Sequence, residues 1–227
     1  MLLEPYTIHV WTASLTLTEE QATKILPILS TDERKRAARF QFPEHRLRYI
    51  ATHFHLRQIL GMYTHSSPET LAFGYTEHKK PFLTNPKNTQ LHFNLSHSGE
   101  KAIYAFGLAH PLGIDIETVR NKCNFDVADR FFSDSERENL SILSDDEKRL
   151  AFYRIWARKE AMIKATGKGL TQSLSAFSVS LEDVTETIIL DNQDWRLCSI
   201  AVGDAYQAAL ACHPSMKSIM VYERDNI

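Results

Sequence analysis

The segment GIDIE at 113–117 contains two acids at a spacing that could hold a metal ion. On a strand, side chains two residues apart point to the same face, so Asp115 and Glu117 lie side by side while the two isoleucines face the core. Neighbouring carboxylates repel unless a cation lies between them or one is protonated. Magnesium takes one or two carboxylates together with phosphate oxygens and water. The alternative is a strand with one solvated acidic face.

A second segment, WARKEAMIKATGKGL at 156–170, indicates the end of a long helix that closes at Gly167 and Gly169. Glu160 and Lys164 are four residues apart and share a helix face. An exposed ion pair in this position contributes only about 0.3–0.5 kcal/mol, which is the plain interpretation. However, Glu160 follows Trp156 by four residues and falls near the edge of the buried stripe, where an acid needs a partner.

The third segment, FNLSHSG at 93–99, predicts a strand that ends in a polar turn. The side chains of Ser96, His97 and Ser98, with the amides of the turn, could hold a phosphate. A nucleophilic Ser–His pair is disfavoured, because adjacent side chains on a strand point to opposite faces and the G-x-S-x-G elbow of hydrolases is absent.

The elements that must position these segments follow a helices-then-strands order that is used twice. The periodicity and the capping residues predict helices at 18–29, 30–39, 44–63, 126–131, 133–142 and 145–166, and strands at 6–11, 70–75, 91–96, 102–108, 113–118, 176–181, 186–190, 195–202, 205–212 and 218–222. We therefore expect an α+β fold of two similar halves, 1–112 and 113–227, related by a pseudo-two-fold, each with helices on a mainly antiparallel sheet. The cleft between the halves is the natural ligand site. A single mixed domain is the alternative.

The composition excludes several classes of protein. The chain has 227 residues, 43% of them hydrophobic, and a formal net charge of −2, which argues against a protein that coats nucleic acid. The three cysteines show no metal-ligand spacing, and no apolar run approaches the roughly 20 residues that span a bilayer. We expect a soluble, cytoplasmic protein that binds neither membrane nor nucleic acid.

Taken in order, the three segments resemble the 4′-phosphopantetheinyl transferases, in particular the larger, monomeric type that activates peptide synthetases and other carrier proteins. Weaker matches are STDERKRAARF at 30–40, Lys80-Pro81, and FFSDSE at 131–136. The resemblance covers most of the chain, and three motifs in series are more specific than any one of them. It implies two similar α/β halves with the cofactor between them.

The resemblance also implies the reaction. A serine hydroxyl of an apo carrier protein (acyl, peptidyl or aryl) attacks the phosphorus of coenzyme A that carries the pantetheine arm, and adenosine 3′,5′-bisphosphate leaves. Phosphoryl transfer of this kind depends on charge stabilisation and alignment more than on covalent help from the protein. By the same resemblance the enzyme would be magnesium-dependent, with coenzyme A as its co-substrate.

By resemblance, the metal ligands would be Asp115, Glu117 and Glu160, and Glu160 would also take the proton from the serine. Lys164 would reach a phosphate oxygen of the pyrophosphate. Ser96 and His97 would contact the 3′-phosphate end, and Lys80 would lie at the adenine edge, through its backbone as much as its side chain.

The first-half basic segment departs from the family pattern, because Glu33 stands where relatives often have a lysine. Arg34, Arg36 and Arg48 are candidates for the 3′-phosphate, and the choice among them stays open. A solvated helix face is the alternative for each of them taken singly.

Two other functions compete with this interpretation. A magnesium-dependent nuclease uses clustered acids and a lysine, but its acid and lysine usually lie on a strand, whereas Glu160 and Lys164 lie on a predicted helix. The net charge of −2 also does not indicate a basic surface for duplex DNA. A binding protein with the same fold would not catalyse a reaction, although a degenerate copy of the enzyme would be expected to lose the acids.

The segment 121–130, which contains Phe125 and Arg130, is a candidate docking site for the acidic carrier protein.

Overall fold

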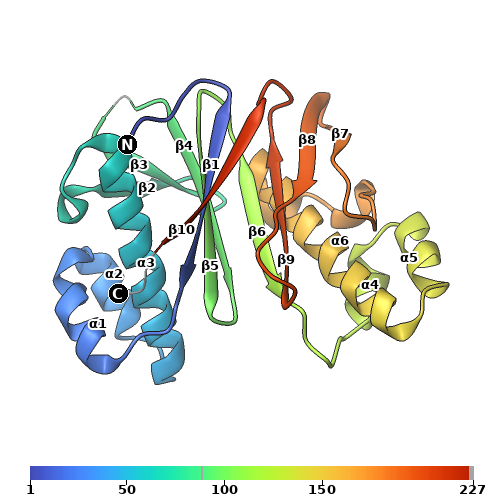
Figure 1. Cartoon of the computed structure of the whole chain (residues 1–227), viewed down its shortest axis with the longest axis horizontal. Helices are drawn as coiled ribbons and strands as arrows, with labels where there is room; N and C mark the ends of the chain where they lie inside the picture. The colour runs from blue at the N-terminus through green and yellow to red at the C-terminus, as the bar shows by residue number, and fades with distance from the viewer. Residues whose placement is uncertain (88, 225–227) are drawn as a thin grey trace.

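In the computed structural model, residues 1–87 and 89–224 are described, and they form two sheets that lie face to face between two groups of helices (Figure 1). The first sheet has the order β10-β1-β5-β4, and the second has the order β6-β9-β8-β7. The strands of the first sheet are β1 (Thr7–Ser14), β4 (Leu91–Ser98), β5 (Lys101–Leu108) and β10 (Ser218–Arg224). Those of the second are β6 (Gly113–Thr118), β7 (Glu186–Leu190), β8 (Gln193–Ser199) and β9 (Tyr206–Cys212).

The helices cover the outer faces of the two sheets (Figure 1). The first group is α1 (Glu19–Ile25), α2 (Thr31–Ala37) and α3 (Pro43–Thr64), and the second is α4 (Asp126–Phe131), α5 (Asp134–Ser141) and α6 (Asp145–Thr166). A short hairpin of β2 (Ala72–Tyr75) and β3 (Pro81–Asn85) forms a separate two-stranded sheet, which does not pair with either of the larger sheets. Separate apolar cores lie under each helix group, and a third core, which includes Ile8, Ile103 and Ile114, lies between the sheets.

This architecture confirms the expected α+β class, with antiparallel pairing throughout the second sheet. One element crosses the expected boundary at 112/113. Strand β10 returns to the first half and pairs in parallel with β1, from Thr7 opposite Ser218 to Ala13 opposite Arg224. The first sheet is therefore completed by a strand from the second half of the chain.

The two halves also repeat a buried ion pair. Ser30 caps α2, and the carboxylate of Glu33 in this capping box accepts a 2.8 Å hydrogen bond from Arg57 on α3. In the second half Ser133 caps α5, and Glu136 lies 2.8 Å from Lys159 on α6. Each carboxylate thus joins a short helix to the buried side of a long one, which satisfies a charge that would be costly to bury alone.

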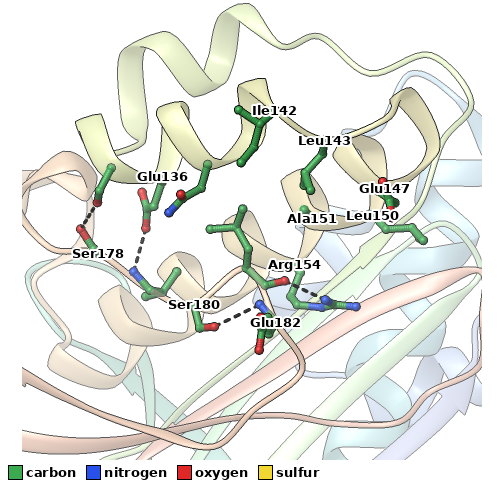
Figure 2. Close-up of a pocket in the computed structure, with 14 residues that line it drawn as sticks. Glu136, Ile142, Leu143, Glu147, Leu150, Ala151, Arg154, Ser178, Ser180 and Glu182 are labelled. Atoms are coloured by element: carbon green, nitrogen blue, oxygen red, sulfur yellow. Dashed lines mark hydrogen bonds between the residues drawn. The ribbon is translucent and has the colours of Figure 1, made fainter.

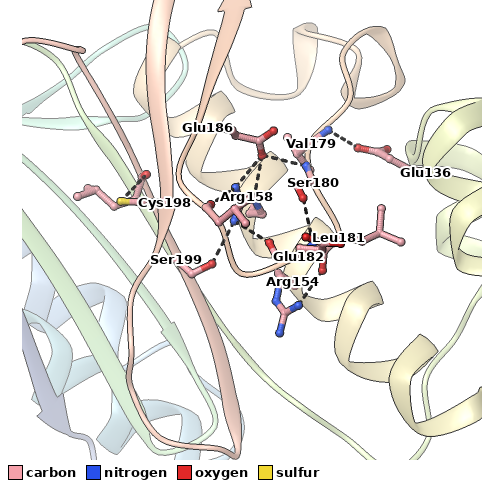
Figure 3. Close-up of polar contacts among 12 residues, drawn as sticks. Glu136, Arg154, Arg158, Val179, Ser180, Leu181, Glu182, Glu186, Cys198 and Ser199 are labelled. Carbon is pink, nitrogen blue, oxygen red and sulfur yellow. Dashed lines mark hydrogen bonds and ion pairs between the residues drawn. The ribbon is translucent and has the colours of Figure 1, made fainter. Parts of the chain in front are cut away.

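The predicted strand at 176–181 is wrong. After a short 3₁₀ turn at Leu174–Ala176 this segment runs without ladder partners, along a hollow of about 630 Å³ between α5 and α6 (Figure 2). Its amides are bound by side chains instead: Val179 N–H donates to Glu136 and Ser180 N–H donates to Glu186 (Figure 3). The sequence does alternate apolar and polar residues as a strand would, but the backbone N–H groups of Val179 and Ser180 are satisfied by carboxylates and not by a neighbouring strand.

Strand β3 was not predicted, because Pro81 opens it and the pairing with β2 is short.

Candidate active site

Strands β4 and β6 bring alternating polar residues of the two halves together. Ser96 Oγ donates to Asp115 Oδ1 at 2.7 Å, and Ser98 Oγ donates to Glu117 Oε2 at 3.1 Å. One register step earlier, Asn94 Oδ1 accepts the N–H of Ile114 at 2.9 Å. The acids of β6 are therefore held from the first half.

The turn expected at the end of 93–99 begins only at Gly99, and its role in binding a phosphate stays a prediction. Strand β4 continues to Ser98, and His97 and Ser98 pair with Ala102 and Lys101 of β5. Both residues therefore lie in the ladder between β4 and β5.

Lys164 closes this cluster from the end of α6. Its Nζ lies 2.6 Å from Asp115 Oδ1 and 2.9 Å from Ser96 Oγ. The approach depends on Gly113, because a Cβ at this position would lie 2.1 Å from the carbonyl oxygen of Ala161 on α6. A glycine at the start of β6 thus allows strand and helix to meet backbone to backbone.

The acids around Lys164 are buried or half-buried. Asp115 Oδ2 is buried without a hydrogen-bond partner. Burial, and then the charge of Asp115, raise the pKa of Glu117 to about 7, and burial also raises the pKa of Glu160. In residues 1–87 and 89–224 no group of three His, Cys, Asp or Glu side chains is arranged to hold a metal ion. The three expected ligands are thus not gathered into a metal cage, and the ammonium of Lys164 compensates Asp115.

Basic and aromatic groups lie beside the cluster. A hollow of about 280 Å³ is lined by Arg36, Tyr49, Thr52, His53, Leu95, Ser96, His97 and Lys164. His97 keeps an exposed face, but the protein packed around its ring lowers its pKa, and the charges of Lys164 and Arg48 add to this effect. Arg34, in contrast, hydrogen-bonds Thr31 on the exposed side of α2 and lines none of the hollows described here.

Two further hollows extend this one into a cleft. A groove of about 1120 Å³ shares Arg36 and Tyr49 with it and adds Lys35, Arg39 and Lys79. A hollow of about 270 Å³ shares Lys164 and Leu95 with it and adds Glu160. Shared lining residues therefore connect a basic first-half end with Lys164 and Glu160 of the second half.

Lys80 lies where the hairpin meets the second half. Its Nζ donates to the carbonyl oxygens of Leu112 at 2.8 Å and Lys164 at 2.6 Å. Its side chain therefore points into the protein, although the residue also lines the hollow that contains Glu160.

Two family models match consecutive parts of the chain. The 4′-phosphopantetheinyl transferase N-terminal model matches residues 11–107, and the 4′-phosphopantetheinyl transferase superfamily model matches residues 111–211. The 4′-phosphopantetheinyl transferase HetI of Nostoc sp. is 36% identical over 90% of this chain and 86% of that protein. The chain belongs to the 4′-phosphopantetheinyl transferase superfamily.

Other members of this superfamily are similar over comparable lengths. The 4′-phosphopantetheinyl transferase Sfp of Bacillus subtilis is 32% identical over 87% of this chain and 88% of that protein. A solved chain, the holo-[acyl-carrier-protein] synthase of Thermotoga maritima, is 22% identical and covers 45% of this chain and 61% of that one, with a TM-score of 0.31. The family models and the HetI and Sfp relatives show that the chain is an enzyme of the transferase class, which agrees with the resemblance found in its motifs.

The sequence interpretation missed several residues of this candidate site. Tyr49, Thr52 and His53 line the hollow with His97, and His53 Nδ1 lies 3.0 Å from Glu33. The signal was available, because these three residues lie three and four apart on one face of the long helix. Ser98 was treated only as part of a turn, yet its hydroxyl hydrogen-bonds the carboxylate of Glu117.

Among the helices of residues 1–87 and 89–224, none combines the length and the apolar composition of a membrane-spanning helix.

Proposed function

We propose that this enzyme transfers the 4′-phosphopantetheine arm of coenzyme A to a serine of an apo carrier protein, leaving adenosine 3′,5′-bisphosphate. The observation that carries the proposal is the cleft that joins basic first-half residues to Lys164 and Glu160, with Asp115 in contact with Lys164. A nucleotide phosphate suits one end of such a cleft, and a cation with a pyrophosphate suits the other.

The basic end suits the 3′-phosphate. Arg36 and His97 share a hollow, and Arg48 acts on the same imidazole, so we assign the 3′-phosphate to these three residues. Arg34 is not assigned, because it does not line this hollow and hydrogen-bonds Thr31 instead. Ser96 is assigned to the acidic cluster, since its hydroxyl bridges Asp115 and Lys164.

Asp115, Glu117 and Glu160 would hold magnesium, which supplies charge neutralisation to the phosphates when it is bound. Lys164 has flexible donors and would move from Asp115 to a phosphate oxygen, because a cation at Asp115 replaces the charge that Lys164 now supplies. Glu160 would accept the proton of the carrier serine, and its raised pKa brings it closer to the working range of a general base.

The proposal includes the surroundings of the enzyme. One chain supplies both sides of the cleft, so we expect a monomer, and we expect it to act in the cytoplasm. We also propose that 1–112 serves the nucleotide and 113–227 the metal and the transfer. The segment 121–130 is proposed as the carrier docking site: Arg130 is exposed there, whereas Phe125 packs edge-on against Phe152.

The test is intact-mass spectrometry of an apo carrier protein incubated with the enzyme, coenzyme A and magnesium. The expected result is a gain of one phosphopantetheine, lost without metal and lost in Glu160→Ala. Glu138→Ala, an exposed acid on α5, is the matched control and should keep full activity. If carriers from several pathways gain no mass while coenzyme A still binds, the chain is a binding protein and the proposal fails.

A further inference from the structure

Lys80 connects the β2–β3 hairpin to the residue before β6 and to the end of α6. Leu112 directly precedes β6, the strand that carries Asp115, and Lys164 is the residue whose side chain neutralises Asp115. Lys80 Nζ donates to the carbonyl oxygens of both residues, at 2.8 and 2.6 Å. One ammonium thus holds the beginning of β6 and the end of α6 at a fixed separation.

The carbonyl of Lys164 needs a partner of this kind. It lies in the last turn of α6, where carbonyls have no partner within the helix and carry partial negative charge. The preceding carbonyl, that of Ile163, is satisfied by Gly167 N–H and Thr166 Oγ1. For the carbonyl of Lys164 the donor is Lys80, which reaches it from 84 residues earlier in the chain.

The backbone of Lys80 is fixed as well. Its N–H donates to Thr76 Oγ1 at 3.1 Å, and its carbonyl oxygen accepts the N–H of Thr76 at 3.0 Å. The turn therefore orients the side chain toward the second half. Burial, and then the charge of Lys164, lower the pKa of Lys80 to about 8, so the ammonium is held against a desolvation cost by the two carbonyls.

We propose that Lys80 is a positioning residue of the transfer reaction. Through the carbonyls of Leu112 and Lys164 it holds the end of α6, which carries Lys164, against the start of β6, the strand of Asp115, and its ammonium does not bind the nucleotide. This role rests on the proposed transferase function. It follows from the direction of the side chain, and it differs from that of a lysine that contributes charge to a phosphate site.

The first experiment compares steady-state kinetics of Lys80→Met and Lys80→Arg with those of the unchanged enzyme. Methionine keeps the lysine side chain up to Cε and removes every donor, so we expect kcat to fall about 10–100-fold through misplacement of Lys164. The KM for coenzyme A should change less than about threefold, since no ligand contact is lost. Arginine keeps donors and charge and should recover part of kcat. Lys87→Met, an exposed lysine after the same hairpin, is the control.

An effect on the KM for coenzyme A in place of an effect on kcat would overturn the proposal. If Lys80→Met raises the KM for coenzyme A and leaves kcat within twofold, the ammonium binds the nucleotide. If kcat and KM both stay unchanged while the melting temperature falls, Lys80 is only structural. If the methionine variant does not fold, Lys80→Gln, whose amide can reach one carbonyl, replaces it under the same criteria.

A second readout separates this inference from the transferase function itself. Amide hydrogen exchange should accelerate at 113–118 and 163–168 in Lys80→Met and not in Lys87→Met, whether or not the enzyme turns over. Absence of carrier modification by the unchanged enzyme rejects the transferase function. Unchanged exchange in Lys80→Met rejects the positioning role.

Discussion

Lys164 Nζ lies 2.6 Å from Asp115 Oδ1, so the end of α6 neutralises a buried acid of β6. Because Asp115 is only 3% exposed, removing the lysine leaves a charge that the protein cannot easily solvate. We expect Lys164→Met to lower the free energy of unfolding by about 2 kcal/mol and to abolish transfer.

The double variant Lys164→Met/Asp115→Asn should regain most of the stability and none of the activity, as measured by urea unfolding and carrier modification. Additive losses of stability would show that the two groups do not interact.

The same ion pair predicts how the fold responds to metal removal. Because Lys164 compensates Asp115 in this structure, a bound cation is not needed to hold β4, β6 and α6 together. We expect a chelator to stop transfer while the melting temperature, measured by circular dichroism, changes by less than about 2 °C. Excess magnesium should restore transfer fully. A large loss of melting temperature with the chelator would mean that the metal is structural.

Glu33 predicts an acid-dependent loss of stability. Burial alone would raise its pKa, but hydrogen bonds and charges from His53 and Arg57 outweigh burial and lower the pKa to about 2. The folded state thus binds fewer protons than the unfolded state between pH 4.5 and 2, so this stabilisation is complete above 4.5 and disappears as the pH falls through 2. Glu33→Gln should cost about 3 kcal/mol at pH 7.

The measurement for Glu33 is chemical unfolding of both proteins across the acid range. The difference in unfolding free energy between Glu33→Gln and the unchanged chain should shrink as the pH falls below 4.5. A difference that stays constant with pH would show that the effect comes from packing and not from the charge.

The close contact at Gly113 predicts that even the methyl group of alanine is not tolerated at this position. A Cβ there would meet the backbone of α6, 2.1 Å from Ala161 O and 2.3 Å from Ala165 N, and neither atom can turn away. We expect Gly113→Ala to lose more than about 3 kcal/mol of stability, together with transfer. In Gly107→Ala the nearest atom is the end of the Leu112 side chain at 3.0 Å, so the loss in thermal unfolding should be much smaller. Equal losses in the two variants would contradict this view of the β6–α6 contact.

The docking proposal gives a prediction about charge. Arg130 is exposed on α4, where its guanidinium lies 5.1 Å from the ring of Phe131, so it can meet an acidic carrier without supporting the core. Arg130→Glu should raise the KM for the carrier several-fold at low salt and less at high salt, with the KM for coenzyme A unchanged. Arg137→Glu on α5 is the control for a change of surface charge. A carrier KM that does not respond in Arg130→Glu would remove 121–130 as the docking site.

Much of the fold could be predicted because the local signals agree with the tertiary structure. The long helix at 145–166 has a capping box at Ser144 and a left-handed glycine at 167, and the structure places it at Asp145–Thr166. The strand at 113–118 alternates acids with isoleucines, and the structure gives the same bounds. Each of these elements is determined by residues within it.

The errors come from interactions that local patterns do not contain. The strand predicted at 176–181 fails because Glu136, more than forty residues earlier, binds the amide of Val179. The site was also only partly predictable. The motifs identified Asp115, Glu117 and Lys164 as candidate site residues. They did not show that the hydroxyl of Ser96 lies between Asp115 and Lys164, because that contact depends on how β4 packs against β6.

The return of β10 to the first sheet has a consequence for synthesis. Thr7 and Ser218, whose hydroxyls lie 2.9 Å apart, are separated by 211 residues, which a ribosome adds in roughly 10–40 s. During that time the outer edge of β1 emerges on the nascent chain with its hydrogen-bonding groups unpaired, and such an edge is open to pairing with other chains. The first half is translated early but can complete its sheet only late, so the newborn protein needs this edge to be protected from other chains, for example by a chaperone.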